Sequence, residues 1–468
     1  SAPFFDPEWM FGVKEGFDVV IGNPPYIQLQ SDHGKLGDLY KPCRYETFAK
    51  TGDIYCLFYE RGWQLLKDNG YLCYITSNKW MRAGYGEATR KFFAEKTDPQ
   101  LLIDFAGEKI FESATVDTNI LLFEKNAQNR GKTSCCIGTS DCRKDLSVFV
   151  KQTATPCAFT SSDSWVILSP IEQSIKRKIE AAGTPLKDWN IQINYGIKTG
   201  CNEAFIIDET KRAEILANCR DTAERKRTDE LIRPILRGRD VKRYAYNWAG
   251  LYLLWIPWHF PLHLDESITG ASEKAESEFH KQFPAVYKHL CVYKEVLSKR
   301  NQSETGIRYE WYALQRWGAN YWDDFSKPKI VWMDLSDVPT FAYDDNTQFA
   351  NNTVYFLSGR ENLLYLLGYL NSKMATYLFS QIGSTSGVGT TRWQAFTMER
   401  LIVPRTTSEK QSQIAGLADR IIEAKKDDPS ADTSSTEQMI DKLVYRLYGL
   451  TADEVAVIGD KSYCEPPK

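Results

Sequence analysis

The feature that most constrains the fold is a short apolar run that ends directly in two consecutive prolines. Residues 17–22 (FDVVIG) have the length and composition of a buried strand, and Asn23-Pro24-Pro25-Tyr26 follows at once. Proline has no backbone N–H and holds φ at about −65°, so neither a helix nor a central strand continues through this pair. The sequence therefore predicts a strand that stops at a stiff loop, which we call the proline loop.

Strand-like and helix-like segments alternate through the first third of the chain. Apolar residues recur at helical spacing over 53–67 and 87–96, and buried-strand runs cover 71–76, 101–105 and 118–124. This alternation favours an α/β layer with a parallel sheet, and the last two runs are close enough to pair.

The remainder of the chain has the pattern of a second, mixed region that closes with helices. The expected strands lie within 191–208, 252–258, 329–333 and 353–357. The expected helices cover 170–182, 362–370, 408–425 and 438–448. We divide the chain into residues 1–165, 166–405 and 406–468.

Charge, cysteine content and hydropathy narrow the class of protein. The 58 basic and 61 acidic residues leave a formal net charge of −3, so a nucleic-acid partner needs a local basic cluster. Eleven scattered cysteines show no Cys-x-x-Cys spacing, which indicates reduced thiols in a cytoplasmic protein and predicts no metal site. The longest apolar runs are far shorter than the roughly 20 residues of a membrane span, so we expect no membrane partner.

The proline loop resembles a motif of amino-methyltransferases, and this resemblance implies the methylation of an exocyclic amine, whose lone pair is delocalised into an aromatic ring. The Asn23 carboxamide oxygen and the Pro24 carbonyl can both accept N–H hydrogen bonds from that amine, which frees its lone pair for attack on a sulfonium methyl. Pro24 and Pro25 fix where the carbonyl points, and Tyr26 offers a flat face for a flipped base. We therefore predict that Asn23, Pro24, Pro25 and Tyr26 are catalytic, the alternative being a plain strand-to-turn sequence.

Asn-Pro-Pro-Tyr after an apolar strand resembles the amino-methyltransferase motif of S-adenosylmethionine-dependent enzymes. The same four residues occur in methyltransferases that act on a glutamine amide and on ribosomal RNA bases, so the motif leaves the substrate open. Two features favour DNA adenine. A long charged and aromatic segment, about 27–51, follows the motif, and a large further region follows the catalytic layer.

The whole chain resembles the C-terminal portion of type IIG restriction-modification enzymes of the Eco57I kind, and also the TaqI-like adenine methyltransferases with their C-terminal specificity domain. The segments that carry the resemblance are 51–81, 110–125, 195–208, 236–244, 329–332 and 365–373. The resemblance implies an α/β fold: a partial Rossmann-like methyltransferase sheet, then an α+β target-recognition domain and C-terminal helices.

The same resemblance implies a function. The expected activity is site-specific methylation of adenine N6 in double-stranded DNA, with S-adenosylmethionine as cofactor and the target base flipped out of the duplex. By the resemblance, Phe111 takes the place of the aromatic side chain that packs edge-on against the flipped adenine. The alternative for Phe111 is an ordinary core residue before a strand.

The second region carries side chains suited to DNA. A basic cluster able to neutralise phosphates consists of Arg233, Arg237, Arg239, Lys242 and Arg243. Further candidates for contacts with DNA backbone or bases are Lys198 and Thr199 in an expected turn, and Arg392 and Trp393 in a Gly/Ser/Thr-rich loop. A solvated surface role is the alternative for each arginine taken singly.

The resemblance also implies parts that this sequence does not show. In the family order, a glycine-rich cofactor loop precedes the proline motif, and only 22 residues precede Asn23 here. Type IIG enzymes carry an N-terminal endonuclease with paired carboxylates, whereas Glu423-Ala424-Lys425 lacks a partner aspartate motif. We therefore expect the chain to need an N-terminal half, in cis or in trans, and to be inactive alone. Two other functions stay open: a stand-alone DNA specificity module, and a phage-defence methyltransferase without a nuclease.

Overall fold

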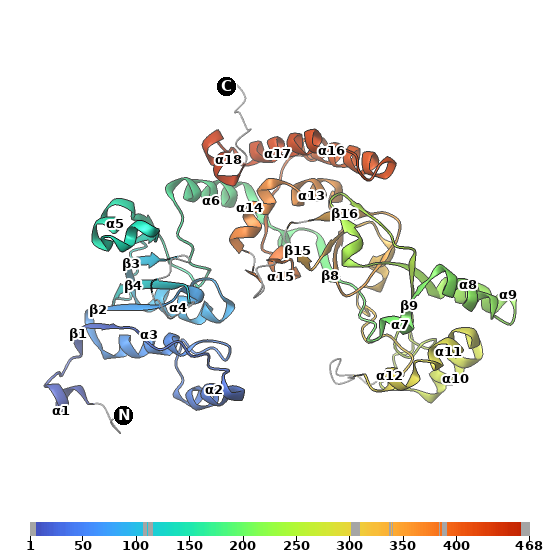
Figure 1. The fold of residues 1–468 in the computed structure, drawn as a ribbon, viewed down its shortest axis with the longest axis horizontal. Coiled ribbons are helices and arrows are strands. Elements are labelled where there is room, and N and C mark those ends of the chain that lie inside the picture. The colour runs from blue at the N-terminus through green and yellow to red at the C-terminus, as the bar shows by residue number, and fades with distance from the viewer. Residues whose placement is uncertain are drawn as a thin grey trace. The chain divides into compact units, whose positions relative to one another are not determined.

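The computed structural model describes two compact units of the chain (Figure 1). The units are Ser1–Ser174 and Ile175–Lys468, and each is described by itself. The residues described are 6–105, 110, 116–300, 309–336, 338, 340–382, 384–385 and 391–459. The division at 165 and 405 expected from the sequence stays a prediction, and the C-terminal helices belong to the second unit.

The first unit contains one six-stranded sheet and its helices. Its strands are β1 (Phe17–Gly22), β2 (Leu66–Ser77), β3 (Asp98–Asp104), β4 (Thr118–Glu124), β5 (Thr133–Ile137) and β6 (Thr155–Cys157). Its helices are α1 (Pro7–Phe11), α2 (Lys35–Tyr40), α3 (Ile54–Leu65), α4 (Glu87–Lys96) and α5 (Leu146–Thr153). Helix α6 (Pro170–Ala182) contains the division between the units.

The sheet has the order β1-β2-β4-β3-β5-β6 and is mixed rather than purely parallel. β1 runs parallel to β2, and β3 runs parallel to β5, but β4 is antiparallel to both of its neighbours. The expected pairing of 101–105 with 118–124 is confirmed in the β3–β4 pair. Antiparallel strands such as these need no crossover helix.

Both faces of this sheet are covered over its inner strands, whereas β1, which was expected to be a buried strand, contains no buried residue. Tyr59 of α3 and Phe93 of α4 pack with Leu72 and Leu121 on one face. Phe149 of α5 packs with Ile103 on the other face. The helices thus form two outer layers around the sheet, and β1 is an edge strand. This is the α/β architecture expected for the first unit.

The second unit combines several small sheets with helices. Its strands are β7 (Gly183–Pro185), β8 (Ile191–Tyr195), β9 (Ile206–Asp208), β10 (Ile232–Leu236), β11 (Val241–Lys242), β12 (Ala245–Tyr246), β13 (Leu251–Leu254), β14 (Lys329–Met333), β15 (Leu335–Ser336), β16 (Phe341–Asp344), β17 (Phe349–Ala350), β18 (Val354–Gly359), β19 (Ser384–Thr385), β20 (Thr391–Arg392) and β21 (Ile402–Pro404). Its further helices are α7 (Asn202–Phe205), α8 (Glu209–Ala217), α9 (Thr222–Leu231), α10 (Glu273–Gln282), α11 (Pro284–Cys291), α12 (Lys294–Ser298), α13 (Leu363–Leu370), α14 (Lys373–Ile382), α15 (Ala395–Met398), α16 (Ser408–Asp427), α17 (Ser434–Tyr448) and α18 (Ala452–Ile458).

The sheet β16-β14-β18-β8 separates two hydrophobic cores of the second unit. Ile330 and Trp332 of β14 contribute to the core that contains α13, α14, α16 and α17, whereas Val331 between them contributes to the other core. This alternation is the period of two expected for a strand buried on both faces. Lys329 and Asp344 lie directly opposite each other in the same sheet and form a fully buried ion pair with a 2.7 Å N–O distance.

Several predicted elements match closely, whereas others differ in their bounds, and the expected strand region 191–208 contains helix α7 between β8 and β9. Helices over 87–96 and 170–182 and the strand 118–124 have the predicted bounds. The second strand is longer than predicted, because it runs from residue 66 through Asn69 at φ 62° instead of starting after a turn. In the described part of the chain, no helix is both long enough and apolar enough to cross a membrane.

Candidate functional site

The proline loop lies at the carboxyl end of β1, where the parallel strand β2 also ends. Asn23 and Pro25 are exposed, Tyr26 is half-buried, and Pro24 is buried. The buried proline ring fixes the loop to the unit while the neighbouring carboxamide stays accessible. In the described part of the chain, no backbone N–H donates to the Pro24 carbonyl oxygen. Two acceptors of the predicted kind therefore stand in consecutive residues.

Tyr26 holds the Asn23 side chain in place. The Tyr26 hydroxyl donates to Asn23 Oδ1 at 3.1 Å and lies 3.4 Å from the carbonyl oxygen of Ile75 in β2. Its ring meets the Tyr55 ring of α3 edge-on, with 6.0 Å between centroids. Burial, and then the nearby Asp53 carboxylate, raise the pKa of Tyr26, so the phenol keeps its proton for this bond. A carboxamide oxygen has two lone pairs, so Asn23 Oδ1 can accept a second hydrogen bond.

A buried polar network next to the proline loop was not identified from the sequence. Thr76 donates to Asn119 Oδ1 at 3.0 Å, and the Trp80 indole donates to the same oxygen at 3.2 Å. Asn78 donates to Asp104 Oδ1 at 2.8 Å. Such buried polar groups are costly unless they are hydrogen-bonded, so the network fixes the ends of β2, β3 and β4. The available signal was polar residues at the ends of apolar runs, as in 76–79.

One two-glycine turn of the first unit has no room for a cofactor. This turn is Gly84-Tyr85-Gly86, directly before α4. A Cβ atom at Gly86 would lie 2.0 Å from the Trp80 carbonyl oxygen, so this turn is filled by the protein's own backbone. An S-adenosylmethionine group therefore does not fit at this turn. Phe111, the predicted second stacking residue, lies outside the described residues.

The basic cluster of the second unit contains side chains that are paired with acidic groups of the protein and side chains that are exposed. Arg237 forms two hydrogen bonds with Asp240, at 3.0 and 2.8 Å, and so closes its own turn. Arg243 pairs with Glu437 of α17 at 2.6 Å and also donates to the Asn371 carbonyl. Arg233, Arg239 and Lys242 are exposed. Charge at the surface therefore comes from three members of the cluster rather than five.

Two other residues that were predicted to contact DNA have buried side chains. Trp393 is 4% exposed and its indole donates to the Ser336 carbonyl at 3.0 Å. Thr199 is 3% exposed and donates to Asn202 at 2.7 Å. Both side chains pack within the second unit, and their contact with DNA stays a prediction. Lys198 is half-buried, and only the backbone of Arg392, in β20, is described.

Two family models match the chain, one in each unit. The Eco57I restriction-modification methylase model matches residues 2–111, which include the proline loop. The TaqI-like C-terminal specificity domain matches residues 233–403, which include the basic cluster. Type II methyltransferase M.BstVI of Geobacillus stearothermophilus is 21% identical over 95% of this chain and 75% of the relative. The restriction enzyme and methyltransferase RM.Eco57I of Escherichia coli is 28% identical over 72% of this chain. This chain resembles the Eco57I-like restriction-modification enzymes.

The solved structures agree with this relationship at the level of the fold. The type IIL restriction-modification enzyme MmeI, solved in complex with DNA, superposes with a TM-score of 0.52 and 13% identity, over 94% of this chain. The chain spans 56% of that structure and 34% of the length of RM.Eco57I. The similarity in fold to this structure therefore includes both segments that the family models match, residues 2–111 and residues 233–403.

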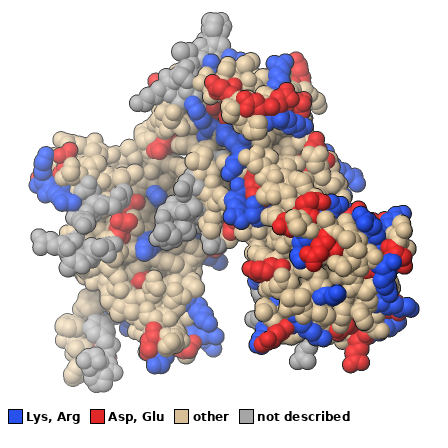
Figure 2. Space-filling view, turned by 45° about the vertical axis from the view of Figure 1, so that its right-hand side comes forward, with Lys and Arg blue, Asp and Glu red and all other residues tan. Residues whose placement is uncertain are grey.

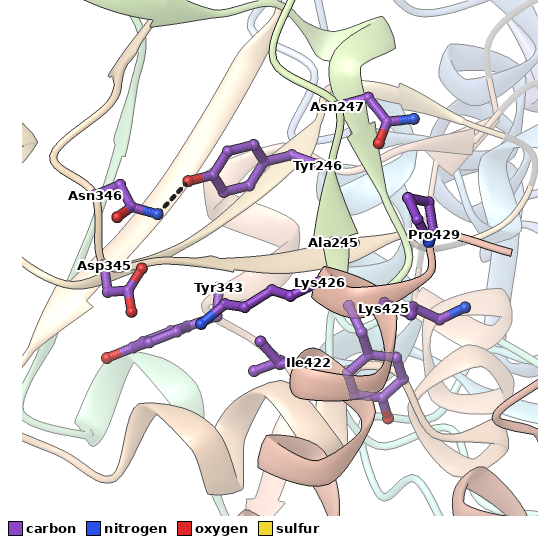
Figure 3. Close-up of a pocket in the computed structure, with 11 residues that line it drawn as sticks. Ala245, Tyr246, Asn247, Tyr343, Asp345, Asn346, Ile422, Lys425, Lys426 and Pro429 are labelled. Atoms are coloured by element: carbon purple, nitrogen blue, oxygen red, sulfur yellow. Dashed lines mark hydrogen bonds between the residues drawn. The ribbon is translucent and has the colours of Figure 1, made fainter. Parts of the chain in front are cut away.

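A separate cavity lies within the second unit, in and beside the TaqI-like part. It has a volume of about 280 Å³ and lies between the β11–β12 hairpin region, the end of β16 and the end of α16 (Figure 3). The Tyr246 hydroxyl accepts from Asn346 at 3.0 Å on one wall, and Tyr343 and Lys426 lie on the other. The full lining is Tyr244, Ala245, Tyr246, Asn247, Tyr343, Asp345, Asn346, Ile422, Lys425, Lys426 and Pro429. None of these residues belongs to the proline loop, so the cavity is a different site.

The surface charge agrees with the small net charge. Figure 2 shows acidic and basic side chains scattered over the visible face, with Lys and Arg gathered most densely in a band near the middle of the view. The face visible in Figure 2 is therefore not uniformly basic. Binding of phosphate would have to rely on local basic side chains such as Arg233 and Arg239.

Proposed function

We propose that the chain is the base-binding part of a site-specific DNA adenine-N6 methyltransferase of a type II (IIG or IIS) restriction-modification system. Its reaction transfers a methyl group from S-adenosylmethionine to an adenine flipped out of the duplex. The observation that carries the proposal is the proline loop, in which the accessible Asn23 oxygen is held by Tyr26 beside the Pro24 carbonyl. The match to the Eco57I methylase model over residues 2–111 supports it.

In the proposed mechanism the protein activates the amine by accepting its hydrogen bonds. Asn23 Oδ1 and the Pro24 carbonyl each accept one N–H of the exocyclic amine, so its lone pair is released from the ring and faces the methyl donor. The proton lost on methylation needs no strong base, because the nitrogen becomes acidic only as it gains the methyl group. The exposed part of the Tyr26 ring provides a stacking surface for the purine.

We propose that the cofactor site is completed by further strands at the outer edge of β1. Among the described residues this strand pairs with β2 on one side only, and Val19 and Ile21 on it are 58% and 78% exposed. Trp9 and Phe11 nearby in sequence are 75% and 61% exposed. An unpaired strand edge flanked by apolar side chains favours strand addition. The added strands would belong to an N-terminal half, supplied by the same polypeptide or by a separate one.

For the second unit we propose contact with double-stranded DNA through Arg233, Arg239 and Lys242. All three side chains are exposed and lie within or beside the segment matched by the TaqI-like specificity domain. Exposed cations that neutralise phosphates release counterions, which makes DNA affinity depend on salt. A specificity module that serves a separate catalytic subunit, or a nuclease-free methyltransferase in phage defence, would use the same surface.

The decisive experiment is methyl transfer by Asn23→Ala. In the complete methyltransferase, incorporation of labelled methyl into DNA should fall by about 10²- to 10³-fold, the usual loss when a preorganised polar contact to the reacting centre is removed. DNA binding should persist, because Asn23 is exposed and lies outside the specificity domain. Gln152→Ala removes an exposed carboxamide from α5 on the opposite face of the sheet and should change nothing. Unchanged methylation in Asn23→Ala would leave the specificity-module function as the better explanation.

A further inference from the structure

Asp53 lies at the N-cap position of α3 and reaches back to the segment that leaves the proline loop. Its Oδ1 atom accepts a hydrogen bond from the backbone N–H of Ile27, the residue directly after Tyr26, at 2.8 Å. This is a charge-assisted bond between residues 26 positions apart, and such bonds are stronger than neutral ones.

Backbone hydrogen bonds strengthen the same junction. The Ile54 N–H donates to the Ile27 carbonyl at 2.9 Å, and the Leu29 N–H donates to the Gly52 carbonyl at 2.9 Å. Gln28 and Asp53 form an antiparallel bridge. The chain is thus held at Ile27 and Leu29, just after the motif, while β1 holds it on the other side.

The first turn of α3 also contacts the loop through an aromatic ring. Tyr55 packs edge-on against Tyr26, and the Tyr55 hydroxyl is hydrogen-bonded to the Tyr85 hydroxyl at 2.8 Å. Asp53 therefore connects the main chain of the loop to the same helix turn that supports the Tyr26 ring. Without it, the ring contact and the backbone bonds would have to define the loop alone.

We propose that Asp53 is a positioning residue for methyl transfer. It holds Ile27 so that the Asn23 oxygen and the Tyr26 ring face the target base, and it does not touch that base itself. The inference rests on the proposed function of the proline loop and adds a residue that lies outside the four residues of that loop. Its consequence is that removing the Asp53 acceptor should disorder the loop without changing the groups that contact the base.

The ionisation of Asp53 should make the rate of methyl transfer depend on pH. Burial raises the pKa of Asp53, against the lowering effect of the N–H groups of Ile27, Tyr55 and Ile54 and of the Lys79 ammonium. The other titratable groups that interact with this carboxyl are Tyr26, Tyr55, Tyr85 and Cys56. Protonation of Asp53 on acidification weakens its bond to Ile27, so methyl transfer should decline on the acid side at a higher pH than an exposed aspartate would cause.

Amide hydrogen exchange of this 468-residue chain tests the positioning directly. Asp53→Ala should speed exchange at the Ile27 amide by about tenfold or more, because its acceptor is lost. Asp53→Asn keeps an oxygen acceptor and should stay close to the wild type. Asp38→Ala removes an exposed carboxylate from α2 and serves as the matched control. The Ile120 amide of β4 reports any general loss of stability. Wild-type exchange at Ile27 in Asp53→Ala would overturn the proposal.

Kinetics of the complete methyltransferase separate positioning from a merely structural role. Asp53→Ala should lower kcat by about tenfold with little change in KM for DNA, since the contacts that recognise DNA remain. Asp53→Asn should keep most of the rate at neutral pH and lose the acid-side decline. An Asp53→Asn variant as slow as Asp53→Ala, or one that keeps the decline, would contradict the proposal. If Asn23→Ala retains activity instead, the proposed function fails while the exchange result still decides the role of Asp53.

Discussion

The proline loop of the first unit and the basic cluster of the second were both identified from residue types, but they differ in what the fold leaves available. Asn23 in the loop is exposed, and its recorded partner is Tyr26 within the same loop. In the cluster, Arg237 and Arg243 are bound to acidic side chains of the protein itself. The two prolines fix the backbone of the motif, so its geometry is set locally. The geometry of a group of charged side chains is instead set by whichever partners the fold brings near them.

The difference arises from the sequence distance of the partners. Tyr26 lies three residues from Asn23, so the contact that orients the carboxamide is local. Glu437 lies 194 residues from Arg243, and no local sequence pattern predicts an ion pair between residues so far apart. We therefore expect substitutions in the proline loop to change catalysis with little effect on stability, and substitutions in the cluster to divide between stability and DNA binding.

The largest effect that sharpens this comparison is expected at Tyr26. Tyr26→Ala removes the stacking surface, which is worth about 1–3 kcal/mol per base, so methyl transfer should fall by about tenfold to a hundredfold. Tyr26→Phe keeps the ring and loses only the hydrogen bond to Asn23, so its loss should be about threefold to tenfold. Steady-state methylation rates of both variants test the order. Equal losses would mean that the hydroxyl, not the ring face, is the functional part of Tyr26.

Sequence periodicity predicted the elements whose burial is decided locally. Strand β4 and helix α4 have the predicted bounds, because their apolar residues alternate or recur within a short window. The antiparallel position of β4 within an otherwise mostly parallel arrangement was missed, because it depends on which strands pair at long range. The extra residues at the start of β2 were missed for the same reason, since Asn69-Gly70 has the composition of a turn.

The candidate site shows the same division. The proline loop could be located from four residues, but the bond from Asp53 to Ile27 could not, because it joins the ends of a 25-residue excursion. Trp393 was predicted to contact DNA because it ends a Gly/Ser/Thr-rich loop, and Thr199 because it lies in an expected turn, but tertiary packing buries both side chains. An aromatic or hydroxyl side chain in a glycine-rich segment is therefore weak evidence for a nucleic-acid contact.

A smaller effect, on stability, is expected at Arg243. Its guanidinium joins β11–β12 to α17 through Glu437 and also donates to the Asn371 carbonyl, and its side chain is 30% exposed. Arg243→Ala leaves both acceptors without this partner and should lower the free energy of unfolding by about 1–3 kcal/mol. Denaturant unfolding of the chain measures this. A variant with wild-type stability but weaker DNA binding would return Arg243 to the DNA-contacting group.

The smallest effect is expected at Arg239, and it distinguishes the two halves of the cluster. Arg239 is exposed, so Arg239→Ala should change the free energy of unfolding by no more than about 0.5 kcal/mol. If its charge faces a phosphate, DNA affinity should fall for all sequences alike, and the slope of log affinity against log salt should decrease by about one. Arg420→Ala removes an exposed arginine from α16 and controls for net charge. Titration of each variant with duplex DNA at several salt concentrations measures the slope and separates a phosphate contact of Arg239 from an effect of net charge. An unchanged slope in Arg239→Ala, or an equal decrease in Arg420→Ala, would show that the cluster acts only through the general charge of the unit.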